Sequence, residues 1–169
     1  MAVIRNARQD DEAALVQIGL LSWEKAMGAV GDPSSMRESA LSAFRDFVSS
    51  SWLTILVIEA HGTVAGWAAC ENRDDLITDF WIEPQFEGQG LGKALLADIE
   101  ADIVRRGFDK ARVETHAQND GAVGFFEKQG YSVHWLSSAY QPKIDRDIQS
   151  MGLSKQLVSD DPGTYGPNF

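Results

Sequence analysis

Residues 83–100, EPQFEGQGLGKALLADIE, constrain the fold of this chain more than any other segment. Gly88, Gly90 and Gly92 occupy alternate positions, and an apolar run with helical spacing follows directly. Each glycine in a regular element costs about 0.5–1 kcal/mol in chain entropy relative to alanine, so three of them indicate a compensating need. The first N–H groups of a helix lack internal partners and carry partial positive charge, and glycine lets a phosphate approach them. The segment therefore predicts an anion site at a helix start, with a simple tight turn as the alternative.

Two common phosphate-binding motifs do not fit these glycines. The motif G-x-x-x-x-G-K-[ST] requires Ser or Thr after Lys93, where this chain has Ala94, and it requires a glycine five residues before Gly92. The motif G-x-G-x-x-G requires a last glycine where Lys93 or Leu95 stands, depending on the starting glycine. The loop is therefore neither a Walker P-loop nor a dinucleotide fingerprint, and we do not expect ATP or NAD to bind.

The rest of the chain alternates between strand and helix patterns. Strand patterns cover residues 2–7, two runs within 53–71 joined at His61-Gly62, and residues 76–84, 110–117, 132–138 and 152–159. Helical patterns cover residues 8–27, 36–50, 91–105 and a short segment from Asn119 to Gly130. Together, these strand and helix patterns predict an α/β (α+β) fold in which helices flank a mixed sheet.

Two of the helical patterns are specific enough to assign a buried face. Asp10 or Asp11 is expected to cap the first helix. Its predicted apolar face consists of Ala14, Leu15, Ile18 and Leu21. The predicted apolar face of the helix after the glycines consists of Leu91, Leu95, Ile99 and Ile103.

The composition narrows the function classes. A chain of 169 residues suits one domain, which we place at residues 1–158, with a tail at 159–169. The net charge of −10 argues against nucleic acid as a partner. No run reaches the ~18 apolar residues of a membrane span, and no signal peptide is recognised, so we expect a cytoplasmic protein without a membrane partner. The chain has a single cysteine, Cys70, which excludes a multi-cysteine metal site. We expect this cysteine to be buried and inert.

Two segments together resemble a known family. WIEPQFEGQGLGKALL and, about thirty residues on, VETHAQNDGAVGFFEKQGY resemble the core of the GNAT superfamily of acyl-CoA-dependent N-acetyltransferases. The resemblance is most specific within residues 77–131 and extends roughly over residues 1–158. It implies a central mixed, mostly antiparallel β-sheet with a splayed parallel strand pair, flanked by helices. It also implies acetyl-CoA as cosubstrate, an amine acceptor and no metal.

The resemblance assigns cofactor-binding roles residue by residue. The pantetheine arm would pair with the strand edge at Phe80, Trp81 and Ile82, in the manner of an added strand. Asn119 would hydrogen-bond the CoA chain, although a plain helix N-cap is the alternative role for this residue. The pyrophosphate would lie on the backbone of Gly88, Gln89, Gly90, Leu91, Gly92 and Lys93.

The chain departs from the family pattern at two positions. Glu87 stands where Arg or Gln usually precedes the first glycine, so a negative charge lies next to the expected diphosphate. Phe126 occupies the position of a tyrosine that usually protonates the leaving thiolate. A thiol with a pKa near ~8.5 can leave with little protonation, so the missing hydroxyl does not exclude catalysis.

An alkylamine acceptor with a pKa near ~10.4 is almost fully protonated at pH 7, so the site must help to remove a proton. The resemblance assigns this role to Glu114, often acting through water. Asp79 is the alternative base, and His116 and His134 are further candidates, although a lone strand histidine is usually structural.

The sequence predicts direct transfer of an acetyl group to a primary amine of a small molecule. Acetylation of protein N-termini, as in the ribosomal-protein enzymes of the family, and a non-catalytic acyl-CoA-binding module are the alternatives. The acceptor itself cannot be named, because acceptor loops carry no portable motif. A homodimer also stays open. Candidates for the acceptor pocket are Trp23, Met27, Asp32 and Tyr140.

Overall fold

The computed structural model describes residues 2–28, 30–141 and 146–159. In chain order its strands and helices are β1 (Ala2–Asn6), α1 (Glu12–Met27), α2 (Arg37–Ser51), β2 (Leu56–Ala60), β3 (Thr63–Ala69), β4 (Leu76–Ile77), β5 (Asp79–Ile82), α3 (Leu91–Arg105), β6 (Lys110–His116), α4 (Asp120–Lys128), β7 (Ser132–Gln141) and β8 (Arg146–Gln156). Short 3-10 turns precede α1, α2 and β2, and another lies between β5 and α3. The tail predicted at 159–169 lies outside the described residues except for Ser159.

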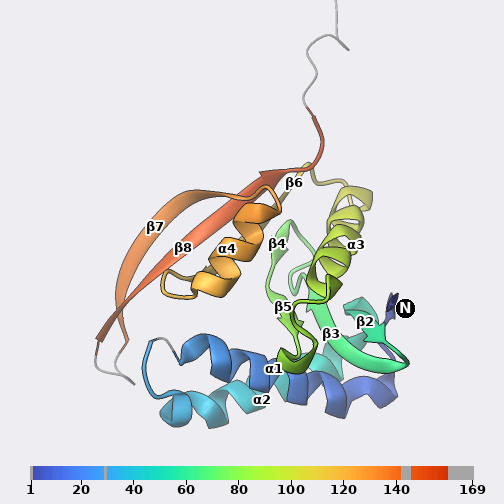
Figure 1. The fold of residues 1–169 in the computed structure, drawn as a ribbon, viewed down its shortest axis with the longest axis horizontal. Helices are drawn as coiled ribbons and strands as arrows, with labels where there is room; N and C mark the ends of the chain where they lie inside the picture. The colour runs from blue at the N-terminus through green and yellow to red at the C-terminus, as the bar shows by residue number, and fades with distance from the viewer. Residues whose placement is uncertain (1, 29, 142–145, 160–169) are drawn as a thin grey trace, which may run out of the picture.

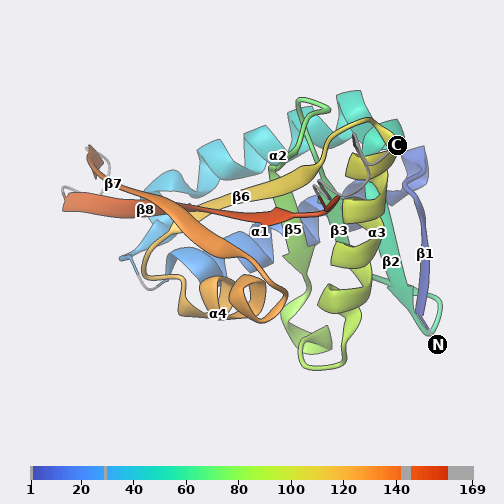
Figure 2. The same ribbon diagram turned by 90° about the horizontal axis from the view of Figure 1, so that it is seen from above.

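Two four-stranded sheets meet at residues 76–82. One has the strand order β1-β2-β3-β5, and the other has the order β4-β6-β8-β7. The pair β4–β6 is parallel, with Ile77 opposite Val113, and the other pairs are antiparallel. Only Thr78 separates β4 from β5, so one extended run passes from one sheet into the other and diverges from β6 (Figure 2). The predicted mixed, mostly antiparallel sheet with a splayed parallel pair is therefore confirmed.

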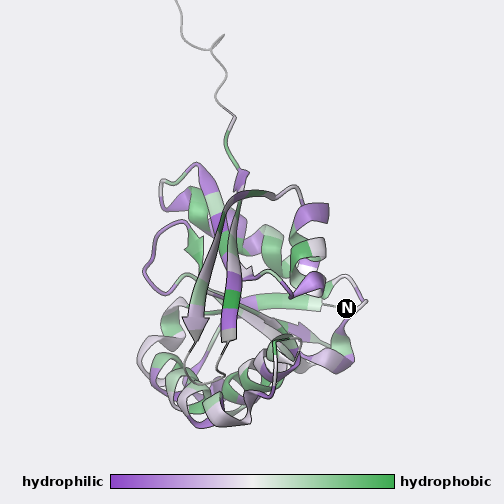
Figure 3. Cartoon of the chain, turned by 90° about the vertical axis from the view of Figure 1, so that its left-hand side faces the viewer, coloured by the Kyte–Doolittle hydropathy of each residue, from purple (hydrophilic) through white to green (hydrophobic). Residues whose placement is uncertain are grey.

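Helices cover both faces of the strand layer. The pair α1 and α2 lies on one face, and α3 and α4 lie on the other (Figure 1). Leu15, Phe44 and Trp67 belong to the apolar cluster under α1 and α2, whereas a second cluster surrounds α3. Hydrophobic and hydrophilic residues alternate along strands and helices alike (Figure 3), as expected of elements with one buried side.

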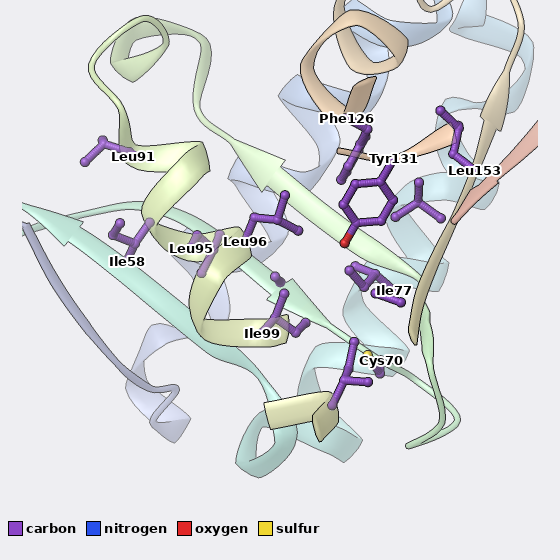
Figure 4. Packing of buried hydrophobic residues seen from close by; sticks show 14 of the residues in the cluster. Ile58, Cys70, Ile77, Leu91, Leu95, Leu96, Ile99, Phe126, Tyr131 and Leu153 are labelled. Carbon is purple, nitrogen blue, oxygen red and sulfur yellow. The ribbon is translucent and has the colours of Figure 1, made fainter. Parts of the chain in front are cut away.

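The helix after the glycines buries the face that the sequence predicts. Leu91, Leu95, Ile99 and Ile103 are all buried. Figure 4 shows Leu95 and Ile99 on the side of α3 that faces the strands, with Ile58 of β2 close to Leu95 in the same cluster. Burying an aliphatic side chain contributes about 1.5–3 kcal/mol, so this stripe holds α3, and with it the glycine loop, on the sheet.

The prediction for the first helix is correct only in part. Leu15 and Ile18 are buried, but Leu21 is 40% exposed and Leu20 is buried instead. The buried face is shifted because α1 packs on α2 as well as on the sheet. At Gly19 a Cβ atom would lie 2.8 Å from the ring of Phe44 in α2.

The predicted acidic cap of the first helix is also corrected. Asp11 occupies the N-cap position of α1, but its side chain makes no cap hydrogen bond. Its carboxylate instead accepts hydrogen bonds from the Arg5 guanidinium and from the Arg8 backbone N–H, at 2.7–3.0 Å. The nearby arginine of β1 therefore orients Asp11, and the carboxylate ties β1 to the start of α1.

The last two strands are longer than predicted. β7 extends to residue 141, and β8 begins at residue 146 rather than 152. The added part of β8 includes Asp147, Gln149 and Ser150, which show no apolar alternation. It is held by backbone pairing, with Ser150 opposite His116 of β6 and Gln149 opposite Ser138 of β7. Pairing without a buried face leaves no periodic signal in the sequence.

Candidate active site

The divergence of β5 from β6 leaves one edge of β5 open. Its other edge pairs with β3 from Ala69–Asp79 to Gly66–Ile82. No described strand pairs with the free edge of residues 79–82. An unpaired edge offers backbone N–H and C=O groups to an extended ligand that contains amides. The backbone of Phe80, Trp81 and Ile82, which the sequence analysis selects for the pantetheine arm, lies in this strand.

The two faces of β5 point into different clusters. Phe80 and Ile82 pack against the cluster around α3, and the Phe80 ring stacks on Phe125 of α4 at 5.7 Å between centroids. Trp81 faces the other way and meets Phe44 of α2 edge-on at 5.6 Å. Since side chains alternate along a strand, Asp79 lies on the same face as Trp81, toward α1 and α2.

The glycine loop leads directly into α3. Gly88 and Gly90 both have φ of 79°, which favours glycine, and Gly90 is the N-cap of the helix. The first intrahelical bond runs from Ala94 N–H to Gly90 C=O, so the N–H groups of residues 91–93 have no acceptor within α3. No side chain caps this helix start. Gln89 and Lys93 are exposed beside it.

The third glycine has a packing role. A Cβ atom at Gly92 would lie 3.3 Å from the ring of Phe125 and 3.8 Å from the side chain of Ile82. This glycine thus lets α3 approach α4 and β5 closely. The three glycines, which form one motif in the sequence, therefore have two roles: Gly88 and Gly90 shape the backbone of the loop, and Gly92 allows close packing of α3.

Glu87, the unexpected acid before the first glycine, has a partner from a distant part of the chain. Its carboxylate lies 2.6 Å from the Lys25 ammonium of α1. Both side chains are about half exposed, so the pair is screened by solvent. The negative charge next to the glycine loop is therefore accompanied by a positive one, which the sequence analysis does not foresee.

Asn119 joins the end of β6 to the start of α4. Its Oδ1 accepts from the Ala122 N–H at 3.3 Å as an N-cap, and its Nδ2 donates to Thr115 Oγ1 at 3.2 Å. Both ends of the amide thus have local partners, and the N-cap role that the sequence analysis keeps as an alternative is present.

Phe126 is a core residue. It is 6% exposed, and its ring meets Phe80, Phe125 and Tyr131 at centroid distances of 5.2–5.5 Å. Tyr131 lies next to it (Figure 4), but the Tyr131 hydroxyl donates to Glu100 at 2.6 Å. Burial and the Glu100 carboxylate both raise the pKa of Tyr131. This hydroxyl is therefore held by a structural bond, and it does not replace the one that Phe126 lacks.

A cavity of about 220 Å³ lies between α1, α2 and the start of β5. Its walls are mostly apolar, and two acids contribute the charged part. The lining residues are Trp23, Ala40, Ala43, Phe44, Phe47, Glu71 and Asp79. Of the four acceptor-pocket residues proposed from the sequence, Trp23 lines this cavity.

The other three proposed acceptor residues do not line the cavity. The Asp32 carboxylate accepts hydrogen bonds from the backbone N–H and the hydroxyl of Ser34. Met27 ends α1, and Tyr140 is 55% exposed on β7. Phe44, Phe47 and Glu71 are lining residues that the sequence analysis does not propose. Phe44 is a buried residue of α2, and nothing in the sequence distinguishes a buried helix residue from one that lines a pocket.

Asp79 is the partly buried acid of the cavity. Its carboxylate accepts hydrogen bonds from Thr78 Oγ1 at 3.0 Å and from Trp81 Nε1 at 3.2 Å. Burial raises the pKa of Asp79 to about 6, the two donors partly offset this rise, and the charge of Glu71 adds to it. A carboxylate in this range can exchange a proton near neutral pH.

The remaining candidate bases have different surroundings. Glu114 is exposed on β6, and Arg112 precedes it on the same face of the strand. His116 Nε2 lies 2.7 Å from the carbonyl oxygen of Ala26, so this nitrogen is the donor, and its buried Nδ1 has no partner among the described residues. His134 is exposed on β7. None of these three residues lines the cavity that contains Asp79.

Cys70 is buried, as predicted, and burial raises the pKa of its thiol to about 11. Within residues 2–28, 30–141 and 146–159, no group of three or more His, Cys, Asp or Glu side chains is placed to hold a metal ion. In the same part of the chain, no helix has the length and apolar character needed to cross a membrane.

Known proteins share both the sequence pattern and the fold. The profile described as "Acetyltransferase (GNAT) family" matches residues 19–131. A protein from Pectobacterium atrosepticum that is named an acetyltransferase is 26% identical over 161 residues, which cover 93% of this chain and 96% of that protein.

Among solved structures, the ribosomal-protein-S18-alanine N-acetyltransferase from Escherichia coli matches with a TM-score of 0.71 and 19% identity, over 98% of this chain and 100% of that one. The PaiA N-acetyltransferase from Thermoplasma acidophilum, solved in complex with coenzyme A, matches with a TM-score of 0.69 and 20% identity, over 92% and 99% of the two chains. At these identities the two structures support the fold.

Proposed function

The chain belongs to the acetyltransferase (GNAT) family, and we propose that it transfers the acetyl group of acetyl-CoA to a primary amine of a small molecule by direct attack. The observation that carries the proposal is an open strand edge with a glycine loop suited to phosphate at one end and a cavity that contains two acids at the other. The coenzyme A bound to the Thermoplasma relative supports the choice of cosubstrate.

In this proposal the positions of the glycine loop, the β5 edge and the cavity set the direction in which acetyl-CoA lies. The diphosphate lies on the N–H groups of residues 91–93, beyond the C-terminal end of β5. The pantetheine arm then runs back along the edge of Ile82, Trp81 and Phe80 and pairs with their backbone. The thioester end accordingly comes closest to the first residue of β5, Asp79, which is one of the residues that line the cavity.

The acceptor amine must lose a proton before or during its attack. Between the two carboxylates considered from the sequence, Asp79 has the stronger support, because it is partly buried, lines the cavity and has a pKa near 6. In this mechanism the Asp79 carboxylate takes one proton from the ammonium, and the freed amine nitrogen forms the new C–N bond as the thioester C–S bond breaks. The second N–H proton then passes to the leaving thiolate, so that free CoA is released. The assignment of Glu114 as a water-mediated base stays a prediction that the same experiment addresses.

The leaving thiolate requires no tyrosine in this scheme. A thiol pKa near ~8.5 makes the thiolate a stable leaving group around neutral pH, whereas an ammonium near ~10.4 must first be deprotonated. The buried ring of Phe126 instead supports the Phe80 side chain on the strand that holds the cosubstrate. Proton removal from the amine is therefore the step on which the chain's own acids act.

Acetylation of a protein N-terminus is the second candidate, favoured by the likeness to the ribosomal-protein enzyme. The cavity volume of about 220 Å³ supports a small acceptor, because sites for drug-sized ligands occupy roughly 300–1,000 Å³. A competition between small amines and N-terminal peptides separates the two functions. A non-catalytic module would bind acetyl-CoA and release no free CoA with any amine.

The test combines binding and turnover. Acetyl-CoA at about a hundred times its dissociation constant should stabilise the protein by ~2.7 kcal/mol, and hence raise the Tm by roughly 5–10 °C. ATP and NAD serve as controls and should cause no comparable shift. Thiol release is then followed with a panel of primary amines for the wild type, Asp79→Asn and Glu114→Gln. Absence of a shift with acetyl-CoA would remove the central claim.

A further inference from the structure

The charge of the cavity points to a particular class of acceptor. We propose that this pocket takes a compact organic ammonium with an apolar or aromatic arm and no anionic group beside its nitrogen, and that Glu71 together with Asp79 rejects acceptors such as α-amino acids. The inference rests on the proposed function, since it specifies the acceptor of the same reaction. Among the described residues that line the cavity, two carry a carboxylate and none carries a positive charge.

The fold holds the two carboxylates near each other. Asp79 pairs with Ala69 at the end of β3, and Glu71 follows two residues later. The Glu71 N–H donates to Thr78 Oγ1 at 2.9 Å, and the Thr78 hydroxyl also bonds Asp79. The charge of Glu71 is close enough to raise the pKa of Asp79. Two acids on one side of a small cavity favour a cation and disfavour any ligand that brings a further negative charge.

The opposite walls suit the organic part of such a ligand. Trp23 of α1 and the Phe44 and Phe47 rings of α2 line the cavity. Phe44 is held edge-on between Trp67 and Trp81, at centroid distances of 6.2 and 5.6 Å, so its position is set by packing. Aromatic faces attract an ammonium group and also bury apolar carbon. An alkyl or aryl chain therefore finds contacts on one side while its ammonium meets the acids on the other.

The two acids play different parts in this selection. Asp79 hydrogen-bonds Thr78 and Trp81 and lies at the thioester end of β5, where it acts on the proton of the bound amine. Glu71 is exposed, and no hydrogen bond to its carboxylate is present among the described contacts, so it can meet the part of the acceptor next to the nitrogen. Replacing Glu71 should therefore change which acceptors are used more than it changes how fast a good one reacts.

The first test compares three acceptors that differ at one group. Phenethylamine has no carboxylate, phenylalanine adds one next to the nitrogen, and phenylalaninamide keeps its size without the charge. We expect kcat/KM to be roughly 100-fold lower for phenylalanine than for phenethylamine, the order expected when a like charge comes within ~6 Å of a carboxylate near a protein surface. Phenylalaninamide should recover most of this loss. Equal use of phenylalanine and phenethylamine overturns the inference and leaves acetyl transfer intact.

The second test assigns the selectivity to Glu71. Glu71→Gln should lower the ratio of phenethylamine to phenylalanine turnover by about tenfold or more, mainly through the KM for phenylalanine. The matched control is Glu127→Gln on α4, on the opposite face of the strand layer from α1 and α2, which removes the same charge elsewhere and should leave the ratio unchanged. An unchanged ratio in Glu71→Gln, or an equal change in both variants, contradicts the assignment. Thermal melts check that each variant is folded.

Direct binding separates this inference from the proposed function. Calorimetry measures phenethylamine and phenylalanine binding to the protein saturated with CoA, where no transfer can occur. Tighter binding of phenethylamine than of phenylalanine, with a smaller difference in Glu71→Gln, supports the inference about the pocket. This holds even if no amine is acetylated, in which case only the proposed function fails. Failure of phenethylamine to bind more tightly than phenylalanine overturns the inference whatever the enzyme acetylates.

Discussion

The two faces of β5 are built in opposite ways. On the α3 and α4 face, the rings of Phe80, Phe125 and Phe126 pack together as an aromatic cluster. On the α1 and α2 face, Asp79 and Trp23 line a cavity that also holds a second acid. The first face is packed ring against ring and supports the strand edge, whereas the second contains a cavity of about 220 Å³.

The difference lies in how far apart the contributing residues are in the chain. The glycine loop, the aromatic cluster and the N-cap Asn119 all come from residues 80–131, one continuous stretch. The cavity takes residues from α1, α2, the end of β3 and β5. A contiguous motif suits the part that is common to a family, and a pocket assembled from several elements can change its specificity one residue at a time.

The largest expected effect falls on the cavity face. Asp79→Asn should lower kcat about 100-fold or more near pH 8 and leave the KM for acetyl-CoA nearly unchanged, since general-base catalysis contributes roughly 10²–10⁴-fold. In the wild type, kcat/KM should fall below about pH 6, where Asp79 becomes protonated. Initial rates across pH for wild type, Asp79→Asn and Glu114→Gln measure this. A larger loss in Glu114→Gln would place the proton acceptor on β6 instead.

Stability should show the cost of keeping that acid in the cavity wall. The pKa of Asp79 is raised to about 6 in the folded state, from 3.8, so the folded protein binds more protons than the unfolded chain between these values and loses stability as pH rises through them. One pKa unit corresponds to ~1.4 kcal/mol, which sets an upper limit of roughly 3 kcal/mol above pH 6.

Asp79→Asn should therefore raise the Tm at pH 8, and this gain should shrink at pH 5 and vanish near pH 4. Thermal melts at the three pH values measure it. The control is Asp98→Asn on the exposed side of α3, which should show no such pH dependence. A Tm difference that is the same at every pH would show that the effect comes from the changed hydrogen bonds to Thr78 and Trp81.

On the glycine-loop face, two alanine substitutions should act in opposite directions. Gly90→Ala places a side chain at φ of 79° and should destabilise the protein by about 1–2 kcal/mol. Gly124→Ala lies within α4, where a Cβ atom would meet nothing within 4 Å, and should stabilise by up to roughly 1 kcal/mol. Denaturant unfolding of both variants measures the difference. Equal effects would mean that the left-handed backbone at Gly90 is not what requires glycine there.

The ion pair next to the loop should have a smaller effect. Glu87→Gln should lower the KM for acetyl-CoA about two- to threefold at low salt, and Lys25→Met should raise it by a similar factor, with kcat nearly constant in both. Both changes should fade at high salt because the pair is exposed. Titration of acetyl-CoA at two ionic strengths measures them. If the KM is unchanged in both variants at low salt, neither charge acts on the diphosphate.

The smallest effect is expected inside the aromatic cluster. Phe126→Tyr restores the hydroxyl that the family pattern contains, but the ring is buried against Phe80, Phe125 and Tyr131 and the thiolate leaves without help. The change in kcat should stay below roughly tenfold, or about 1.4 kcal/mol. Single-turnover rates with one amine measure it. A large gain would show that departure of the thiolate limits the reaction.

Much of the α3 and α4 face could be predicted from the sequence alone. Helical spacing identified the buried stripe from Leu91 to Ile103, and the glycines marked the loop before it. The strand that carries Phe80 to Ile82 and the cap at Asn119 were also located. These features are local, because backbone conformation, helix capping and amphipathic spacing act over a few neighbouring residues.

Features that depend on contacts between distant segments could not be predicted from the sequence. Lys25 and Glu87 are 62 residues apart, and only the packing of α1 brings them together. The shift of the buried face from Leu21 to Leu20 follows from the contact of α1 with α2. The extension of β8 rests on backbone pairing with β6, which leaves no pattern in its own residues.

The sequence by itself determined the family, the glycine loop and the edge strand, since each lies within one short stretch whose residue types dictate its local conformation. The tertiary structure alone decided that Glu71 and Asp79 share a cavity with Trp23 and the rings of α2. It also decided that burial raises the pKa of Asp79 to about 6. Burial and the distances between charges are properties of the assembled layers, and no single segment of the chain contains them.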